Sequence, residues 1–453
     1  MSLLPVLLRR AAAARSRWLS VLIAVTLPAS ALHAGVLVVD SGGGAAFTTI
    51  QAAVNAAVDG DVILVKTGTS NYAGFTVQDK ELVIVGDRPT FPVRVRGRVV
   101  VQNLAATRTV VLGWLDVDLP PNPTPLEALV ASGIAGQLRV QRCLLKGARG
   151  MHVEDPSDPA GYGMGSTGGT GVTVLASSGG IAFVGCTIDG GAGGGVGGTG
   201  ATLGGLGGDG VRCEGARVVF HDDVVRAGRA GDGSYSGNDG GIGARILSGV
   251  FATQTAGSNT SFTGGNGSMG EDLGSFCLGP GGDGGHGLWI GSGVSSWQLA
   301  CTNVAGLGQC GSPPGQAGQP SVVLGSLATF QVTSVKLTAP PLVRAGTTMP
   351  FTFTGTPGDA LYLESSRRTS FDGLPSWRGF RLARPVGLNL APRVPVPPVI
   401  LPASGTVTLQ VDAPELGPGE LERTVYYQVY RAAPNGSITL GSFAAVTVVD
   451  PSY

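Results

Sequence analysis

Short runs of alternating apolar and polar residues recur through the middle of the chain. This period-two alternation indicates β-strands with one buried face. Four such runs begin at Val172, Val211, Ala244 and Leu288. Each run starts at the apolar position of a nine-residue motif, G-x-x-G-G-x-G-apolar-x. The motifs start 39, 33 and 44 residues apart, a spacing typical of repeat architectures. A small turn and a second β-like run follow each first run, so the pattern predicts two strands and a glycine-rich loop per coil of a β-solenoid.

The alternation also predicts which side chains point inward. Val174, Cys213, Ile246 and Ile290 occupy equivalent inward positions of the four repeats. Cys213 therefore replaces a core valine or isoleucine. We expect a buried free thiol there that behaves as a small hydrophobic side chain.

The residues between the inward positions form an outward column that contains Arg212, Arg245 and Trp289. If the coils stack directly, neighbours in this column lie about 4.8 Å apart. Two arginines beside an indole face could hold an acidic sugar. The alternative is a solvated outer face in which Glu214 neutralises the arginines.

A second column is predicted from the later runs, in which Cys143, Cys186 and Asp223 align. Strand spacing falls within the Cα separation that a disulfide tolerates, so Cys143 and Cys186 form the first candidate bridge. Cys277 and Cys310 lie in consecutive glycine-rich loops and form the second. Six cysteines could pair in 15 ways, and none of the spacings suggests a zinc site.

Composition narrows the class of protein. The chain has 453 residues, with 30 basic and 30 acidic side chains, so charge gives no reason to expect nucleic acid as a partner. Residues 1–34 contain four arginines, an apolar run and small residues in the order of a signal peptide, which predicts secretion and an oxidising compartment. No later segment is long and apolar enough to predict a transmembrane helix.

The segment Phe47 to Gly86 resembles the opening of secreted right-handed parallel β-helix proteins of the pectin-lyase-like class. In that class a short helix covers the open end of the solenoid, which otherwise exposes core and unpaired strands. Thr48 and Gln51 have the spacing of a capping box. The resemblance covers about residues 36 to 332 and implies an all-β fold, a right-handed parallel β-helix over residues 35–332. It says little of activity, because this fold hosts enzymes, adhesins and inert scaffolds.

The glycine-rich insertions all fall at the same place in the coil, so they are expected to project from one side. They could expose backbone groups to a glycan or a protein, or form a flexible fringe without a ligand. One copy, GGLGGDGVR, resembles the calcium-binding nonapeptide of toxin repeats, but only Asp209 fits the metal position. We therefore expect neither a metal nor another cofactor.

A catalytic hypothesis comes from a resemblance to polygalacturonases. Gly-His-Gly around His286 is similar to the histidine motif of that family, and Asp222 with Asp223 is similar to its aspartate pair. Inverting hydrolysis needs two carboxyl groups about 6.5 to 9.5 Å apart. However, the pair precedes His286 by more than a coil, and no basic residue lies between His286 and Lys336. His286 also fills the variable position of the repeat. A uronate lyase would need a basic residue near an acidic cluster, and Lys146 has none.

Beyond residue 332 prolines replace the glycine pattern, and strand-like runs separated by turn residues predict a β-sandwich of the immunoglobulin or fibronectin type over residues 333–453. The leading hypothesis is a secreted or cell-surface protein without catalytic activity that binds glycan or a cell-envelope partner, or serves structurally. The alternative is a polysaccharide hydrolase or lyase. Nothing in the sequence requires an oligomer, and a monomer is favoured.

Overall fold

The structure is a computed structural model, in which almost all regular structure is β-strand. It describes residues 35–68, 70–87, 92–154, 163–195, 203–233, 236–253, 260–269, 279–299, 301–330, 335–374, 379–383, 398–432 and 437–453. The predicted signal peptide lies outside these ranges. No helix within them is long and apolar enough to cross a membrane.

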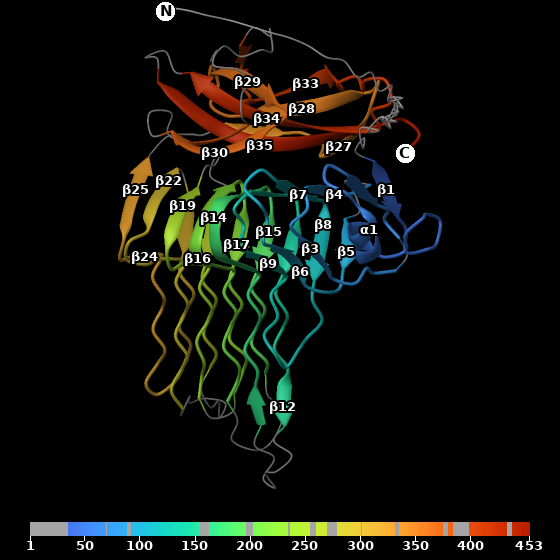
Figure 1. The fold of residues 1–453 in the computed structure, drawn as a ribbon. Helices are drawn as coiled ribbons and strands as arrows, with labels where there is room; N and C mark the ends of the chain where they lie inside the picture. The colour runs from blue at the N-terminus through green and yellow to red at the C-terminus, as the bar shows by residue number, and fades with distance from the viewer. Residues whose placement is uncertain are drawn as a thin grey trace, which may run out of the picture. The chain divides into compact units, whose positions relative to one another are not determined.

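Residues 36–330 wind into coils of three parallel strands each, one more than the sequence predicted (Figure 1). The second β-like run of each repeat contains two strands, which meet at residues of positive φ such as Gly185 (63°) and Asp222 (61°). The first strands are β3 (Phe75–Gln78), β6 (Val99–Gln102), β9 (Leu129–Ser132), the starts of β14 (Val172–Val184) and β16 (Val211–His221), β18 (Ala244–Ile246), β21 (Leu288–Ile290) and β24 (Ser321–Val323).

The second strands are β1 (Val36–Val39), β2 (Val62–Val65), β4 (Leu82–Gly86), β7 (Thr109–Gly113), β10 (Gln137–Gln141), the ends of β14 and β16, β19 (Gly249–Thr253), β22 (Ser295–Leu299) and β25 (Ser326–Phe330). The third strands are β5 (Val93–Val95), β8 (Leu115–Asp118), β11 (Leu144–Lys146), β15 (Thr187–Asp189), β17 (Val224–Arg226), β20 (Ser261–Thr263) and β23 (Thr302–Val304). Each strand pairs with the equivalent strand of the next coil, so the chain builds a β-solenoid.

The predicted register of the inward column is confirmed. Val174 pairs with Cys213, and Cys213 pairs with Ile246. The Cys213 thiol is free and 1% exposed, and burial raises its pKa. The core of the same coils holds an aromatic ladder in which the rings of Phe183 and Phe220 stack at 5.1 Å. Identical inward positions on successive coils thus fill one continuous core.

A short helix, α1 (Ile50–Ala56), precedes the first complete coil and buries Ile50, Ala53 and Val54 in the solenoid core. Its N-cap is Thr49, whose Oγ1 accepts the Ala52 N–H at 3.2 Å, not Thr48 as the capping-box pattern predicted. Gln51 instead bonds both backbone groups of Thr76 on β3. The polar spacing that suggested a capping box therefore joins the helix to a strand.

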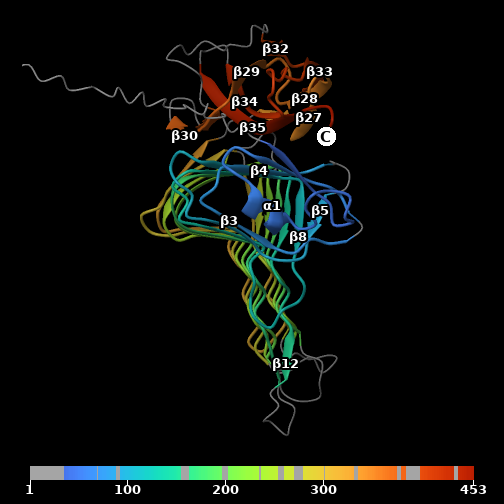
Figure 2. The same cartoon turned by 45° about the vertical axis from the view of Figure 1, so that its right-hand side comes forward.

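The glycine-rich segments run side by side away from the strands, as Figures 1 and 2 both show. We call the part that leaves a third strand the outgoing leg and the part that enters the next first strand the returning leg. The legs alternate, and backbone hydrogen bonds link each to the next. One series of these bonds runs through successive legs: Gly191 N–H to Gly169 O, Gly208 to Gly191, Gly228 to Gly208, Gly241 to Gly228, Gly265 to Gly241, Gly285 to Gly265 and Gly306 to Gly285, at 2.7 to 3.0 Å.

The bonding of each leg repeats every three residues. In one returning leg Gly207 donates to the next returning leg, Gly208 donates to an outgoing leg, and Asp209 takes the third place. A three-residue repeat without internal hydrogen bonds is the geometry of polyproline II and of collagen chains, where glycine is needed wherever chains touch. A Cβ on Gly285 would lie 1.8 Å from Gly241 O, and one on Gly208 would lie 2.2 Å from Gly169 O.

This bonding corrects both sequence hypotheses about the glycine-rich segments. They are not a loose fringe, because two of every three backbone N–H groups bond a neighbouring leg. The same bonds remove most of the exposed backbone groups that a ligand was expected to use. The two-stranded pair β12 (His152–Glu154) and β13 (Gly163–Gly165) lies at the tip of the first such pair of legs.

Residues 335–453 form mostly antiparallel sheets around a second core that includes Phe351, Phe353 and Tyr427. The strands are β26 (Lys336–Thr338), β27 (Leu342–Arg344), β28 (Thr348–Thr354), β29 (Ala360–Ser366), β30 (Thr369–Leu374), β31 (Gly379–Ala383), β32 (Val399–Ile400), β33 (Thr406–Asp412), β34 (Glu422–Ala432) and β35 (Ile438–Val449). A third core joins these strands to the second strands of the solenoid.

Candidate functional site

In several of the glycine-leg repeats, the backbone N–H of the third residue bonds no backbone carbonyl, and a side chain of the preceding coil accepts it. On the returning legs Asp209 Oδ1 accepts the Ile242 N–H at 2.8 Å, and Asp239 Oδ1 accepts the Asp283 N–H at 2.9 Å. Asn266 Oδ1 does the same for Leu307 on the outgoing legs, at 2.9 Å. Where the variable position of the repeat carries an accepting side chain, that side chain therefore has a structural hydrogen-bonding role.

His286 belongs to the same set. Its Nδ1 accepts the Gln319 N–H at 2.9 Å, just as Asp283 Oδ1 accepts the Gln316 N–H at 2.7 Å. An imidazole that accepts through Nδ1 carries its proton on Nε2 when neutral. The glycines on both sides of His286 serve the leg packing, which explains why the sequence resembled a catalytic motif.

Those of the accepting side chains that lie on the returning legs line a groove of about 380 Å³. It brings together three residues that the sequence suggested separately, Asp209, Arg245 and His286. The carboxylate of Asp209, the residue that fits the metal position of the toxin repeats, is paired here with an arginine, because its Oδ2 accepts from Arg245 Nε at 2.7 Å. Asp239, Asp283, Gln316 and Gln319 complete the polar lining.

Sequence reasoning missed Asp239 and Asp283. Both occupy the third position of their repeat, which was read as variable and therefore unimportant. In each residue Oδ1 accepts a backbone N–H of the next coil. The Oδ2 atom makes no hydrogen bond within the part of the chain that the structure describes. Both side chains are exposed. Their spacing of one repeat was a usable signal, since it places two carboxylates on adjacent legs.

The outward column of Arg212, Arg245 and Trp289 exists as predicted, because Arg212 pairs with Arg245 and Arg245 with Trp289. Its positive charge is partly compensated. Arg245 binds Asp209, and Arg212 Nη2 lies 4.0 Å from Glu214 Oε2. Arg245 is the one member that also lines the groove.

Asp222 and Asp223 are not near His286, since they occupy the corner between β16 and β17 and share no cavity with it. Asp223 is fully buried and accepts the N–H groups of Cys186 and His221, at 2.6 and 2.7 Å. Burial raises its pKa well above the usual value. Asp222 forms an ion pair with Lys336. The two consecutive aspartates therefore have structural roles at a corner of the coil.

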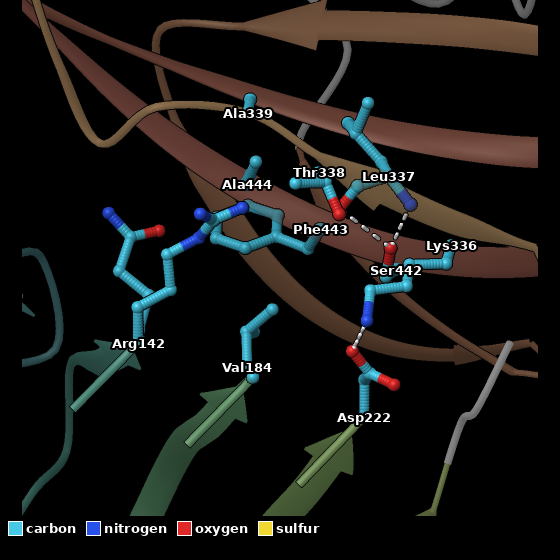
Figure 3. A pocket seen from close by; sticks show the side chains of 12 residues that line it. Arg142, Val184, Asp222, Lys336, Leu337, Thr338, Ala339, Ser442, Phe443 and Ala444 are labelled. Atoms are coloured by element: carbon cyan, nitrogen blue, oxygen red, sulfur yellow. Dashed lines mark hydrogen bonds and ion pairs between the residues drawn. The ribbon is translucent and has the colours of Figure 1, made fainter. Parts of the chain in front are cut away.

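Figure 3 shows the cavity of about 230 Å³ beside this corner. Arg142, Val184 and Asp222 come from adjacent coils and face Lys336 and Ser442. Burial lowers the pKa of Arg142, and the Asp222 carboxylate opposes that shift. Ser442 Oγ bonds the backbone N–H of Leu337. The polar groups here serve mainly to join β26 and β35 to the solenoid.

The first candidate disulfide is wrong. Cys143 and Cys186 are free, buried thiols, although their predicted column is present, with Thr187 N–H bonding Cys143 O at 2.9 Å. Stacked parallel strands hold equivalent Cβ atoms at about 4.8 Å, whereas a disulfide needs about 3.5 to 4.5 Å. Cys301 is also free. Cys277 lies outside the described residues, so its pairing with Cys310 stays a prediction.

No group of His, Cys, Asp and Glu side chains within the described ranges could hold a metal ion. The chain was compared with known proteins. No protein-family model matches it, and no curated protein matches it.

Proposed function

We propose that this chain is a secreted protein without catalytic activity that binds a hydroxyl-rich glycan in the groove of its returning legs. In this proposal the solenoid is a right-handed, pectin-lyase-like β-helix with α1 as its cap, and residues 333–453 form a β-sandwich. The mature protein acts outside the cell or at its surface, as a monomer. The groove is the binding element, and the rest of the solenoid holds it in shape.

The observation that carries the proposal is the row formed by Asp239 and Asp283. One oxygen of each carboxylate is fixed by the next coil, which orients the second oxygen without using it. Fixed acceptors lose little rotamer freedom on binding. Gln316, Gln319 and Arg245 line the same groove and can supply donors. Such a mixture of acceptors and donors suits sugar hydroxyl groups.

The size and charge of the groove fit the same ligand class. Its volume of about 380 Å³ is within the roughly 300 to 1,000 Å³ of small-ligand sites. The Asp209–Arg245 pair neutralises itself, and the carboxylates of Asp239 and Asp283 leave the lining with a net negative charge, which favours neutral over acidic sugars. Trp289, next to Arg245 in the outward column, adds a half-buried ring beside the groove.

Absence of catalysis is supported by the bonds of the acid and base candidates. Asp223 is buried and accepts two backbone N–H groups, Asp222 pairs with Lys336, and His286 Nδ1 accepts from Gln319. Hydrolysis of the polygalacturonase type would need two carboxyl groups and a histidine around one sugar. Here the predicted pair, Asp222 and Asp223, shares no cavity with His286.

The test is a screen of the full chain against neutral and acidic polysaccharides, with binding and cleavage scored separately. We expect binding of at least one neutral polysaccharide and no release of reducing ends. If the wild type cleaves a polysaccharide and the variant His286→Ala does not, the proposal is overturned in favour of a hydrolase.

The variant Asp283→Ala should weaken binding about tenfold or more, because it removes an oriented acceptor. Asn266→Ala is the matched control, since it deletes the same kind of N–H acceptor on the opposite set of legs. Equal loss of binding in both variants would mean that the groove acts only through stability.

A further inference from the structure

A third cavity, of about 780 Å³, lies between the solenoid and the turn that joins β29 to β30. We call it the arginine cleft. Arg217, Arg367 and Arg368 line it, against two carboxylates, Glu81 and Asp372. Arg367 and Arg368 are exposed, and neither forms a salt bridge within the described residues. The cleft therefore carries excess positive charge.

Arg217 is the fixed cation of this cleft. Its Nη2 donates to Phe371 O at 2.9 Å, and its guanidinium lies 5.0 Å from the centre of the Phe371 ring. No carboxylate pairs with it in the described part of the chain. A guanidinium has five N–H donors, so most of its donors remain for another partner while its position is already set.

A glycine makes this arrangement possible. Arg217 lies beside Gly180 on the neighbouring coil, and a Cβ on Gly180 would lie 2.1 Å from the Phe371 ring. Because Gly180 has no side chain, Phe371 rests on the solenoid next to Arg217. The ring thus holds the guanidinium at the wall of the cleft.

A further uncompensated cation lies behind the wall of the cleft. Arg139 is 1% exposed, and its Nη2 donates to Gln137 Oε1 and Ser370 O, at 2.9 and 2.7 Å. Both residues that accept these bonds line the cleft. Arg139 has no carboxylate partner among the described residues, and a charge in such surroundings is little screened. Its charge adds to the positive potential of the cleft.

The remaining lining suits hydroxyl groups. Thr107, Thr109 and Gln137 come from the solenoid, and Ser370 comes from β30. The volume is large enough for one or two sugar units. From the cations and these polar groups we infer that the arginine cleft binds a small hydroxylated anion, a sugar whose carboxylate, sulfate or phosphate group contacts Arg217 and Arg368.

Isothermal titration calorimetry on the full chain tests this site with digalacturonate, its neutral counterpart galactobiose, a sulfated galactose and inorganic phosphate. We expect at least one anionic sugar to bind about tenfold or more tightly than galactobiose, with an affinity that falls as salt rises. Inorganic phosphate that binds as tightly as every anionic sugar would overturn the part of the inference that concerns the sugar. No anion binding above that of galactobiose would overturn all of it.

Two variants locate the binding. Arg368→Gln changes an exposed side chain and should leave the unfolding midpoint unchanged while it weakens anion binding about tenfold. Arg217→Gln should weaken it further, and Arg212→Gln, an exposed arginine on the same strand outside the cleft, should bind as wild type. Wild-type affinity in both cleft variants would contradict the assignment. Asp283→Ala should leave anion binding unchanged, so this site can fail or succeed independently of the groove.

Discussion

The imidazole of His286 accepts the backbone N–H of Gln319 through Nδ1, at 2.9 Å. The two residues are 33 positions apart and lie at equivalent places on adjacent returning legs. The N–H of Gln319 donates to no backbone carbonyl in the bonding pattern of the legs, so the imidazole is its acceptor. What looks in the sequence like an active-site histidine is one of a set of side chains, with Asp209, Asp239 and Asp283, that each accept a backbone N–H of a following coil.

A structural role for His286 predicts unequal effects of two substitutions. His286→Ala removes the acceptor and should lower the free energy of unfolding by about 1 kcal/mol. His286→Asn places an amide oxygen near the position of Nδ1 and should restore most of the loss. Urea denaturation followed by circular dichroism measures both. Equal stability of the alanine variant and the wild type would argue against a structural role for the His286 hydrogen bond.

The packing of the glycine legs predicts that their glycines differ sharply in tolerance. Gly285→Ala puts a methyl group 1.8 Å from Gly241 O, so the legs must separate. We expect a loss of about 2 to 3 kcal/mol or failure to fold. Gly195→Ala, whose nearest neighbour is 3.8 Å away, should be tolerated. Thermal unfolding of the two variants makes the comparison, and similar midpoints would contradict the packed array.

Much of the solenoid could be predicted from sequence because its register repeats. The alternation around Val174, Cys213 and Ile246 placed all three in one inward column, and the strand pairing agrees. The number of strands per coil was missed, because the corner at Gly185 or Asp222 is a single residue of positive φ within what reads as one β-like run. One residue of any type leaves no compositional signal.

The candidate site was less predictable. A repeat pattern identifies the constant positions, which here are glycines. It gives no information about the function of the variable third position. Asp239 and Asp283 matter through bonds to the next coil, which depend on stacking and not on local sequence. The contacts of Arg139 and Arg217 with residues more than 150 positions later are likewise outside the reach of a repeat argument.

The cysteines give a chemical prediction. Cys143, Cys186 and Cys213 are buried free thiols, and burial raises the pKa of Cys186 and of Cys213. A neutral, inaccessible thiol reacts slowly. In the folded protein these three should resist alkylation at pH 8 and should all react in denaturant. Peptide mapping by mass spectrometry follows each site, and a Cys143–Cys186 disulfide in the native protein would contradict the structure.

Glu422 at the start of β34 predicts a pH dependence of stability. Burial raises its pKa from 4.5 to about 7, and the neighbouring carboxylates of Glu420 and Asp61 act in the same direction. Between these values the unfolded chain loses the proton while the folded chain keeps it. The free energy of unfolding therefore falls as pH rises from about 4.5 to 7, and the loss is complete above that range.

Glu422→Gln removes this titration. The variant should match the wild type near pH 4 and exceed it at pH 8 by about 1 to 2 kcal/mol, a value below the full 1.36 kcal/mol per pKa unit because the side chain is still partly exposed to solvent. Urea unfolding at the two pH values provides the measurement. Glu214→Gln, an exposed glutamate of the solenoid, is the control and should change little at either pH. A variant less stable than wild type at pH 8 would mean that the ionised carboxylate has a stabilising partner, such as Arg423, that outweighs its burial.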